Sequence, residues 1–368
     1  MTVETALALE DGTVFRGRSF GAPVDAEAEV VYNTCMTGYQ EIATDPSYRG
    51  QMVAMTFPLI GNYGVSLDDQ ESRQPWIAAL IVREYCDDPS NWKSVSSLST
   101  YLNASGIPGL CDIDTRALTR RLRSRGTMRA VLAHDAGGQS DDALRERALR
   151  VMPLSDKDLV AETSVDQSYH WSVVRGGRTG RIAVIDCGIK ENILRSLGRF
   201  GGDLVVLPYD TTTTEVLALS PNGVVVSNGP GDPVRMTDCI ETVRGLIQTG
   251  IPMLGICLGH QILGMAAGGT TSRLRFGHHG GNHPVYNARS GQVHITSQNH
   301  EFQVDADSIA PSSGFYVSET NLNDRTVEGL AHETLPIFSV QYHPEGSPGP
   351  QDNQYLFDRF LSLGENRP

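Results

Sequence analysis

The 368-residue sequence contains six cysteines but no C-x-x-C pair. Closely spaced cysteines are typical of zinc sites and disulfide frameworks, so neither is expected here. The sequence also lacks a G-x-x-x-x-G-K-[ST] motif, which excludes a phosphate loop of the ATPase type. No apolar run approaches the roughly 18 residues of a membrane span, and the segment Met1–Glu10 has no basic stretch followed by a long apolar one. We expect a cytoplasmic protein that has no membrane partner.

Basic residues are scarce relative to acidic ones, at 30 against 43, and the formal net charge is -13. Such a surface repels phosphate groups, so neither nucleic acid nor an anionic membrane is expected as a partner. The length and a hydrophobic content of 39% fit a globular protein with two domains. A polar, glycine-containing stretch at residues 164–181 is typical of an exposed connection between domains. We therefore predict domains at residues 1–178 and 179–368.

The N-terminal domain is predicted to mix strands and helices. The dipeptide Asp11-Gly12 between two apolar runs predicts an antiparallel hairpin. Asp114 and Gly126 have the positions and residue types of the start and end of a helix, whose Leu118 and Leu122 would face the core. This helix carries five arginines, for which an anion site and a docking surface are alternatives to the favoured solvated face. The arginines are Arg116, Arg120, Arg121, Arg123 and Arg125.

The C-terminal domain contains short apolar runs without polar alternation, at residues 182–186, 204–207, 223–227 and 251–256. Strands buried on both faces have this pattern, which predicts a parallel sheet with helices on each side. The predicted fold class is α/β, with a mixed N-terminal domain and a doubly wound, mainly parallel C-terminal domain. Loops at the carboxyl ends of such strands usually form the functional site.

Cys257 is the candidate nucleophile. It lies at the centre of Gly255-Ile-Cys-Leu-Gly259, between an apolar strand and a helical stretch, which is the cysteine form of a nucleophile elbow. The flanking glycines allow a sharp backbone turn, and the helix N-terminus favours a thiolate. A structural cysteine in a glycine-rich turn is the alternative.

His343 and Glu345 are the candidate general base and its orienting group. They follow an apolar run that begins at Phe338, and residues two apart in an extended chain point the same way. A nucleophilic thiol needs a base, and the base needs a third group that fixes its tautomer. Although a lone histidine is more often an ordinary core or surface residue, its occurrence together with the elbow predicts a Cys-His-Glu triad.

Two further segments have functional alternatives. The loop Ser227–Pro233 is rich in residues that expose backbone amides, so Gly229 and Leu258 are predicted to form an oxyanion hole, with an ordinary turn as the alternative. The histidine-rich segment Phe276–His283 invites a metal-site interpretation. We reject it because no acidic or thiol ligand lies at a suitable spacing, and no metal site is predicted.

Three motifs together resemble the class I glutamine amidotransferases. They are Ser227-Asn-Gly-Pro-Gly-Asp-Pro233, Gly255-Ile-Cys-Leu-Gly-His-Gln261 and Tyr342-His-Pro-Glu345. Further similarity, in Thr37-Gly-Tyr-Gln-Glu41, Gly61-Asn-Tyr-Gly64 and other segments, extends over nearly the whole chain. The chain as a whole is similar to the small, glutamine-hydrolysing subunits of carbamoyl-phosphate synthetase.

The resemblance implies that the chain releases ammonia from glutamine through a thioester on Cys257. The ammonia would pass through an enclosed tunnel to a separate large subunit, which makes carbamoyl phosphate from it with bicarbonate and ATP. The product would serve pyrimidine biosynthesis, arginine biosynthesis or both. No cofactor is expected in this chain, and ATP with Mg²⁺ or K⁺ would be bound by the large subunit.

The resemblance also implies which residues hold glutamine. They are Ser47, Gly229, Gly231, Leu258, Gln261, Asn299, Glu301 and Phe302. Glu301 stands where the family usually has glycine. The family makes this contact through the backbone, so binding is expected to survive, but a carboxylate near that of the substrate could raise KM.

Three other interpretations are weighed. Amidotransferases of anthranilate and guanylate synthesis share the triad loops but lack a counterpart of the N-terminal domain. A non-catalytic docking protein is disfavoured by the intact triad, and hydrolysis of glutamine by the purified chain would exclude it. A cysteine peptidase is the weakest alternative.

Overall fold

The computed structural model describes residues 4–171, 180–200 and 203–365. The chain divides into two compact units, one of residues 1–157 and 275–279 and the other of residues 158–274 and 280–368. The boundary expected near residue 178 lies outside the described residues, so the predicted domain limits stay a prediction.

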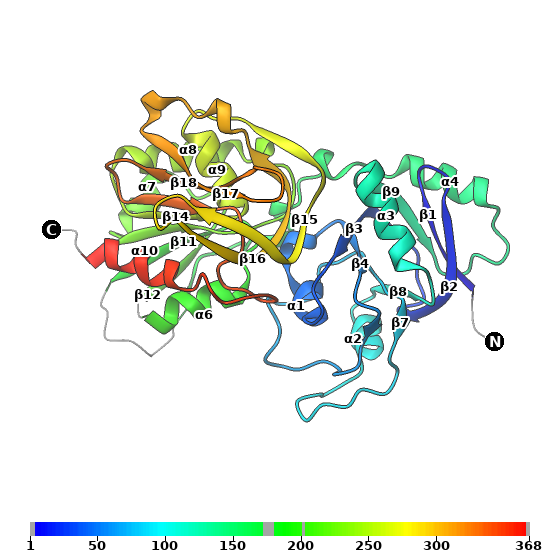
Figure 1. Ribbon diagram of the computed structural model, residues 1–368. Coiled ribbons are helices and arrows are strands. Elements are labelled where there is room, and N and C mark those ends of the chain that lie inside the picture. Colours follow the sequence, from blue (N-terminus) through cyan, green and yellow to red (C-terminus); the bar gives the residue numbers. More distant parts are fainter. Residues whose placement is uncertain (1–3, 172–179, 201–202, 366–368) are drawn as a thin grey trace. The chain divides into compact units, whose positions relative to one another are not determined.

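The first unit is built around a closed barrel with the strand order β1-β2-β8-β6-β4-β3-β9 (Figure 1). The barrel strands are β1 (Glu4–Leu9), β2 (Val14–Gly21), β3 (Ala26–Asn33), β4 (Gln51–Met55), β6 (Ala79–Ile81), β8 (Pro108–Cys111) and β9 (Met128–Ala133). A separate parallel pair is formed by β5 (Leu59–Ile60) and β7 (Glu84–Tyr85). The helices are α1 (Tyr39–Thr44), α2 (Leu98–Ala104), α3 (Thr115–Arg125) and α4 (Asp141–Arg150).

Local sequence accounts for the first hairpin and for α3. The antiparallel pair β1 and β2 turns at Gly12, whose φ of 89 favours glycine, so the predicted hairpin is confirmed. The Asp114 side chain accepts a hydrogen bond of 2.9 Å from a backbone amide of the first turn of α3. The helix ends at Gly126, and Leu118 and Leu122 are buried as predicted.

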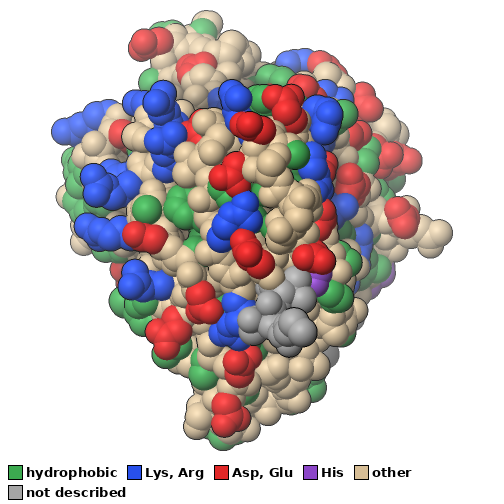
Figure 2. Space-filling model, turned by 90° about the vertical axis from the view of Figure 1, so that its right-hand side faces the viewer, with side chains coloured by type: hydrophobic (Ala, Val, Ile, Leu, Met, Phe, Trp, Pro, Cys, Tyr) green, Lys and Arg blue, Asp and Glu red, His purple; other side chains and the backbone are tan. Residues whose placement is uncertain are grey.

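The arginines of α3 make dispersed contacts. Arg121 forms an ion pair of 2.6 Å with Asp11, and the guanidinium of Arg123 lies 5.9 Å from the ring centre of Phe276. Figure 2 shows Lys and Arg side chains mixed with Asp and Glu over the face in view. Four of the five arginines are exposed and Arg121 is half-buried, which agrees with the interpretation of α3 as a solvated helix face.

The second unit contains a ten-stranded sheet with the order β10-β12-β11-β13-β14-β19-β18-β17-β15-β16. Its strands are β10 (Tyr169–Trp171), β11 (Arg181–Asp186), β12 (Asp203–Pro208), β13 (Gly223–Val226), β14 (Met253–Ile256), β15 (Thr271–Asn287), β16 (Gln292–Val304), β17 (Phe315–Asn321), β18 (Val327–His332) and β19 (Ile337–Val340). Its helices are α5 (Val160–Thr163), α6 (Glu191–Phe200), α7 (Thr213–Ala218), α8 (Thr237–Gln248), α9 (Leu258–Ala266) and α10 (Tyr355–Glu365). Strands β12, β11, β13, β14 and β19 pair in parallel, and β18, β17 and β15 continue the sheet with antiparallel pairing.

Helices cover both faces of the parallel part of this sheet (Figure 1). Helices α7, α8 and α9 pack on the face that carries Val224 and Val226, and α6 and α10 pack on the face that carries Val225. Strand β13 is therefore buried on both sides, as its unbroken apolar run predicts. Strand β14 begins at Met253, later than its apolar run, because Pro252 has no N–H to donate. The α/β fold, doubly wound around the parallel strands β12, β11, β13, β14 and β19, is confirmed, and antiparallel strands extend this sheet on both sides.

None of the helices in the described part of the chain is long and apolar enough to cross a membrane.

Candidate active site

Cys257 lies at the junction between β14 and α9, at the carboxyl end of the parallel sheet. Its φ of 54 and ψ of -105 are unusual for a residue that carries a side chain, and the side chain is buried. At Gly259, an added Cβ would lie 2.1 Å from the carbonyl oxygen of Val226, so only glycine allows this turn to pack on β13. The geometry is that of a nucleophile elbow.

His343 and Glu345 lie in the segment that follows β19. The Nδ1 atom of His343 is 2.7 Å from Oε1 of Glu345, and both side chains are buried. The amide of His343 donates to the carbonyl of Ser297 at 2.9 Å. The thiol of Cys257 is 3.5 Å from the carbonyl oxygen of Asn299. Among the described residues, Nε2 of His343 has no hydrogen-bond partner, which leaves this atom for the thiol or a substrate.

Neighbouring charges determine the protonation of His343. Burial by itself lowers its pKa, but the Glu345 carboxylate and a charge on Cys257 outweigh burial and raise the pKa to about 10. Burial opposes ionisation of Glu345, but Lys190 and His343 outweigh it and lower the pKa of Glu345 to about 2. At neutral pH the pair is therefore an imidazolium and a carboxylate.

Lys190 belongs to this site, and the sequence interpretation missed it. Its Nζ atom donates to Oε1 of Glu345 at 2.8 Å. Its backbone amide donates to Oδ1 of Asn228 at 3.2 Å, and Nδ2 of Asn228 donates to the carbonyl of Gly188 at 3.0 Å. Asn228 thus connects the loop after β11 to the loop after β13. The available signal was a single lysine at the carboxyl end of a buried strand.

Gly229 lies next to the side chain of Leu258, the residue that directly follows the cysteine. Leu258 is the first residue of α9, where an amide has no acceptor within the helix. Neither amide donates a hydrogen bond to another described residue. A Cβ at Gly229 would lie 2.1 Å from the carbonyl oxygen of Cys187, so this loop passes its neighbour too closely for any other residue. The two free donors suit an oxyanion, while their assignment as its binding site stays a prediction.

The residues predicted to hold glutamine are divided between the units. Gly229, Gly231, Leu258, Gln261, Asn299, Glu301 and Phe302 lie in the second unit. Nε2 of Gln261 donates to the carbonyl of Phe302 at 2.9 Å, which joins α9 to β16. Ser47 lies in the first unit, where its amide donates to Oδ1 of Asp45 at 2.9 Å. The roles of all these residues in binding stay predictions.

Glu301 has a counter-charge in the second unit. Its side chain is buried, and Oε2 lies 3.3 Å from NH2 of Arg273. The guanidinium of Arg273 also lies 5.9 Å from the ring centre of Phe302. The additional carboxylate that the sequence places next to the predicted glutamine site is thus paired with a cation.

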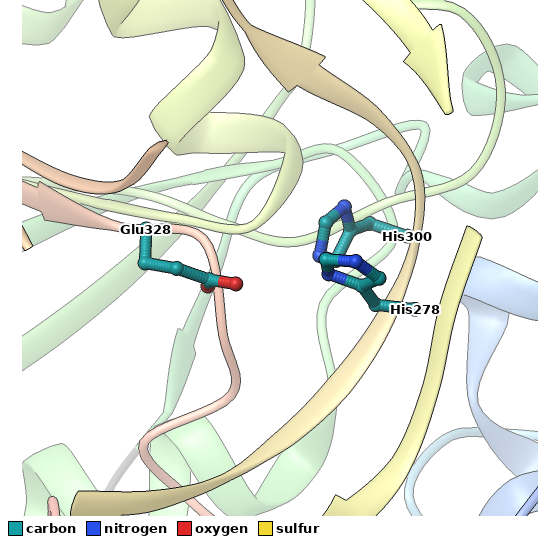
Figure 3. A group of neighbouring side chains, drawn as sticks. All are labelled: His278, His300 and Glu328. Carbon is teal, nitrogen blue, oxygen red and sulfur yellow. The ribbon is translucent and has the colours of Figure 1, made fainter. Parts of the chain in front are cut away.

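Figure 3 shows His300 and Glu328 of the second unit, with the Glu328 carboxylate directed toward His300, and also His278 of β15. Nε2 of Gln298 donates to Oε2 of Glu328 at 2.9 Å, and Oε1 of Gln298 lies 2.9 Å from Nε2 of His300. Nδ1 of His300 lies 2.8 Å from the carbonyl oxygen of Phe302. Both ring nitrogens of His300 thus lie within hydrogen-bonding distance of protein oxygens. The expectation that the chain has no metal site stays a prediction.

Comparisons with known proteins cover both units. Residues 7–132 match the family described as carbamoyl-phosphate synthase small chain, CPSase domain, and residues 183–363 match glutamine amidotransferase class-I. The chain is 51% identical to a carbamoyl phosphate synthase small chain of Symbiobacterium thermophilum, covering 96% of this chain and 97% of that one. A protein of the same name from Methanopyrus kandleri is 48% identical and covers 98% and 99%. One from Fusobacterium nucleatum is 46% identical and covers 98% of each.

We predict that Gly229→Ala lowers the rate of ammonia release from glutamine by ~10²–10³, the usual loss for one oxyanion donor. The added Cβ would collide with the Cys187 carbonyl and move the amide of residue 229. The measurement is kcat of the purified full chain. Gly138→Ala is the matched control, because its Cβ would meet nothing within 4 Å. A Gly229→Ala protein as active as the control would contradict the oxyanion assignment.

Proposed function

The chain belongs to the carbamoyl-phosphate synthase small-chain family, and on this premise we propose that Cys257, His343 and Glu345 carry out its glutamine hydrolysis. Membership in the family makes the chain the glutamine-hydrolysing subunit of that enzyme. The observation that supports the proposed triad is the buried contact of 2.7 Å between His343 and Glu345, which leaves Nε2 of His343 unpartnered among the described residues.

The first half-reaction forms a thioester. The Cys257 thiolate attacks the side-chain carbonyl carbon of glutamine, and the resulting oxyanion accepts hydrogen bonds from the amides of Gly229 and Leu258. The C–N bond then breaks as the proton on Nε2 of His343 moves to the departing nitrogen. Ammonia leaves, and a γ-glutamyl thioester and a neutral histidine remain.

The second half-reaction uses the neutral histidine as a base. A charge on Cys257 is one of the causes that raise the pKa of His343, and the thioester carries no such charge. The pKa of His343 therefore falls once the thioester has formed. The ring then stays neutral, and a neutral ring can take a proton from water. The hydroxide attacks the thioester carbon, the C–S bond breaks, glutamate is released and the thiolate is regenerated.

Delivery of the ammonia to a large chain follows from the chemistry of the product. Ammonia is mostly protonated in water at neutral pH and then loses its nucleophilicity, so an enclosed passage to the partner preserves its reactivity. The relatives are named small chains of carbamoyl phosphate synthase, which implies a large chain that consumes the ammonia. The resulting carbamoyl phosphate would be available for pyrimidine or arginine biosynthesis.

We assign the docking of the large chain to a loop pair of the first unit, residues 61–68 and 90–97. The amide of Val65 donates to the carbonyl of Ser96 at 3.0 Å, which holds the two segments side by side. Figure 1 shows these loops, the first in blue and the second in cyan, extending away from the barrel. The pair exposes Leu67, Trp92 and Val95, at 76%, 89% and 60%. An exposed tryptophan among apolar side chains is typical of an interface hot spot.

We predict that Cys257→Ser abolishes carbamoyl phosphate synthesis from glutamine in the complex with the large chain. Synthesis from added ammonium should remain, because the serine hydroxyl is a weak nucleophile here and the large chain is unchanged. The two rates are measured on the same complex. Cys86→Ser, at a half-exposed thiol of the first unit, is the control. Continued use of glutamine by Cys257→Ser would exclude Cys257 as the nucleophile.

We predict that Arg273→Met raises KM for glutamine by roughly three- to tenfold, with little change in kcat, because it removes a cation that is paired with the Glu301 carboxylate. Adding Glu301→Gly to this variant should restore KM. Arg244→Met, which removes an exposed arginine of α8, is the control. An additive effect of the two changes on KM would show that the pair does not act on the substrate as a unit.

We predict that Trp92→Ser weakens binding of the large chain by roughly tenfold or more, the usual effect of losing a hot-spot tryptophan. Hydrolysis of glutamine by the isolated chain should not change. Affinity is measured by titrating the two purified chains. Val293→Ser removes an apolar side chain of the second unit with 51% exposure and is the control. Equal affinities of the two variants would place the interface elsewhere.

A further inference from the structure

We infer that Lys190 is a positioning residue of the triad, a buried cation that holds the Glu345 carboxylate against His343 and completes a row of alternating charges. The inference rests on the proposed function, because it concerns the same site.

The contact between Lys190 and Glu345 is enclosed by protein. The two side chains are 2% and 0% exposed, and Nζ lies 2.8 Å from Oε1. The same oxygen lies 2.7 Å from Nδ1 of His343. One carboxylate oxygen is thus held between an ammonium and an imidazole. Nδ2 of Asn192 donates to the backbone carbonyl of Glu345 at 2.9 Å, which fixes the segment that carries the carboxylate.

The residue type at position 190 agrees with this role. The chain has 30 basic residues, and lysine occurs only at positions 93, 157 and 190. The other two lysines are partly or fully accessible to solvent, so lysine occupies the buried position in a chain that elsewhere uses arginine. An ammonium is a compact point charge, whereas a guanidinium is a broad planar fork. A closed space beside one carboxylate oxygen fits the ammonium better.

Stability alone does not explain a buried ion pair at this position. Removing two charges from water costs several kcal/mol per ion, and apolar replacements of such pairs are often neutral or stabilising. The pair is, however, in direct contact with the proposed catalytic base. A role in the chemistry of the site accounts for the retention of both charges there.

The charges along this row alternate in sign. Lys190, from the loop after β11, and His343, from the segment after β19, are the charged groups that face Glu345, and Cys257, at the start of α9, faces His343. Removing the cation at position 190 makes the potential at both His343 and Cys257 more negative. Each of these groups then retains its proton to a higher pH, so both limbs of the activity profile move in the alkaline direction.

The test compares Lys190→Met, which removes the charge, with Lys190→Arg, which keeps the charge but alters the packing. Two readouts on the full chain are the pH profile of kcat/KM for glutamine and the pH dependence of alkylation of Cys257 by iodoacetamide, followed on the Cys257 peptide by mass spectrometry. For Lys190→Met we expect the acid limb and the alkylation midpoint to move up by about one pH unit. Lys190→Arg should lower the rate without moving either position. Lys93→Met is the control for loss of an exposed lysine charge.

The inference would be overturned if both variants lost activity while the limbs of the kcat/KM profile and the alkylation midpoint stayed where they are in the unmodified protein. Lys190 would then contribute only to packing. Should Lys190→Met fail to fold, Lys190→Gln provides a neutral side chain that can still donate to Glu345, and the same shift is expected from it. Alkylation needs no turnover. The two proposals can therefore fail separately. If the unmodified protein does not hydrolyse glutamine but Lys190→Met still shifts the alkylation midpoint of Cys257, the proposed function is refuted and the inference is supported.

Discussion

Parallel pairing of β11, β13, β14 and β19, which are neighbours in the sheet, brings the loops after these strands to one edge. Those loops carry Lys190, Gly229, Cys257 and His343 in turn. Residues from distant parts of the sequence therefore lie near one another, and no long loop is needed to bring them together. Because the helices on both faces bury the strands, the edge is a rigid support, and the unusual dihedral angles of Cys257 are imposed by the packing around it.

Local patterns in the sequence were sufficient for the parts of the site that depend on close neighbours. The glycines around Cys257 predict the elbow, and the spacing of His343 and Glu345 predicts their contact. Each of these features depends only on residues that are close together in the sequence. Lys190 could not be found in this way. Its partner Glu345 is 155 positions away, and the contact exists only because β11 and β19 belong to one sheet. A single lysine after a strand has no pattern that distinguishes it from a surface residue.

The same distinction applies to the first unit. The turn at Asp11-Gly12 predicts a hairpin from adjacent residues, and Asp114 predicts a helix start. Closure of the barrel depends instead on pairing between β1 and β9 and between β3 and β9, for example of Ala8 with Val131. Strand pairing over such a separation is set by the packing of the whole unit, which no short window of sequence contains. The sequence therefore indicated a mixture of strands and helices there, but no barrel.

Burial of the row formed by Lys190, Glu345, His343 and Cys257 lowers the stability of the fold but strengthens the electrostatic interactions between these groups. In water, the high dielectric constant would reduce the interaction between a charge on Cys257 and His343 to about 1 kcal/mol at a separation of about 4 Å. In the enclosed site the same change acts through a medium of lower dielectric constant, so in the proposed mechanism thioester formation would convert the histidine from an acid into a base. The contacts of Glu345 with Lys190 and with His343 would hold the ring in place during this change. The proposed change in the role of His343 would then be electrostatic in origin.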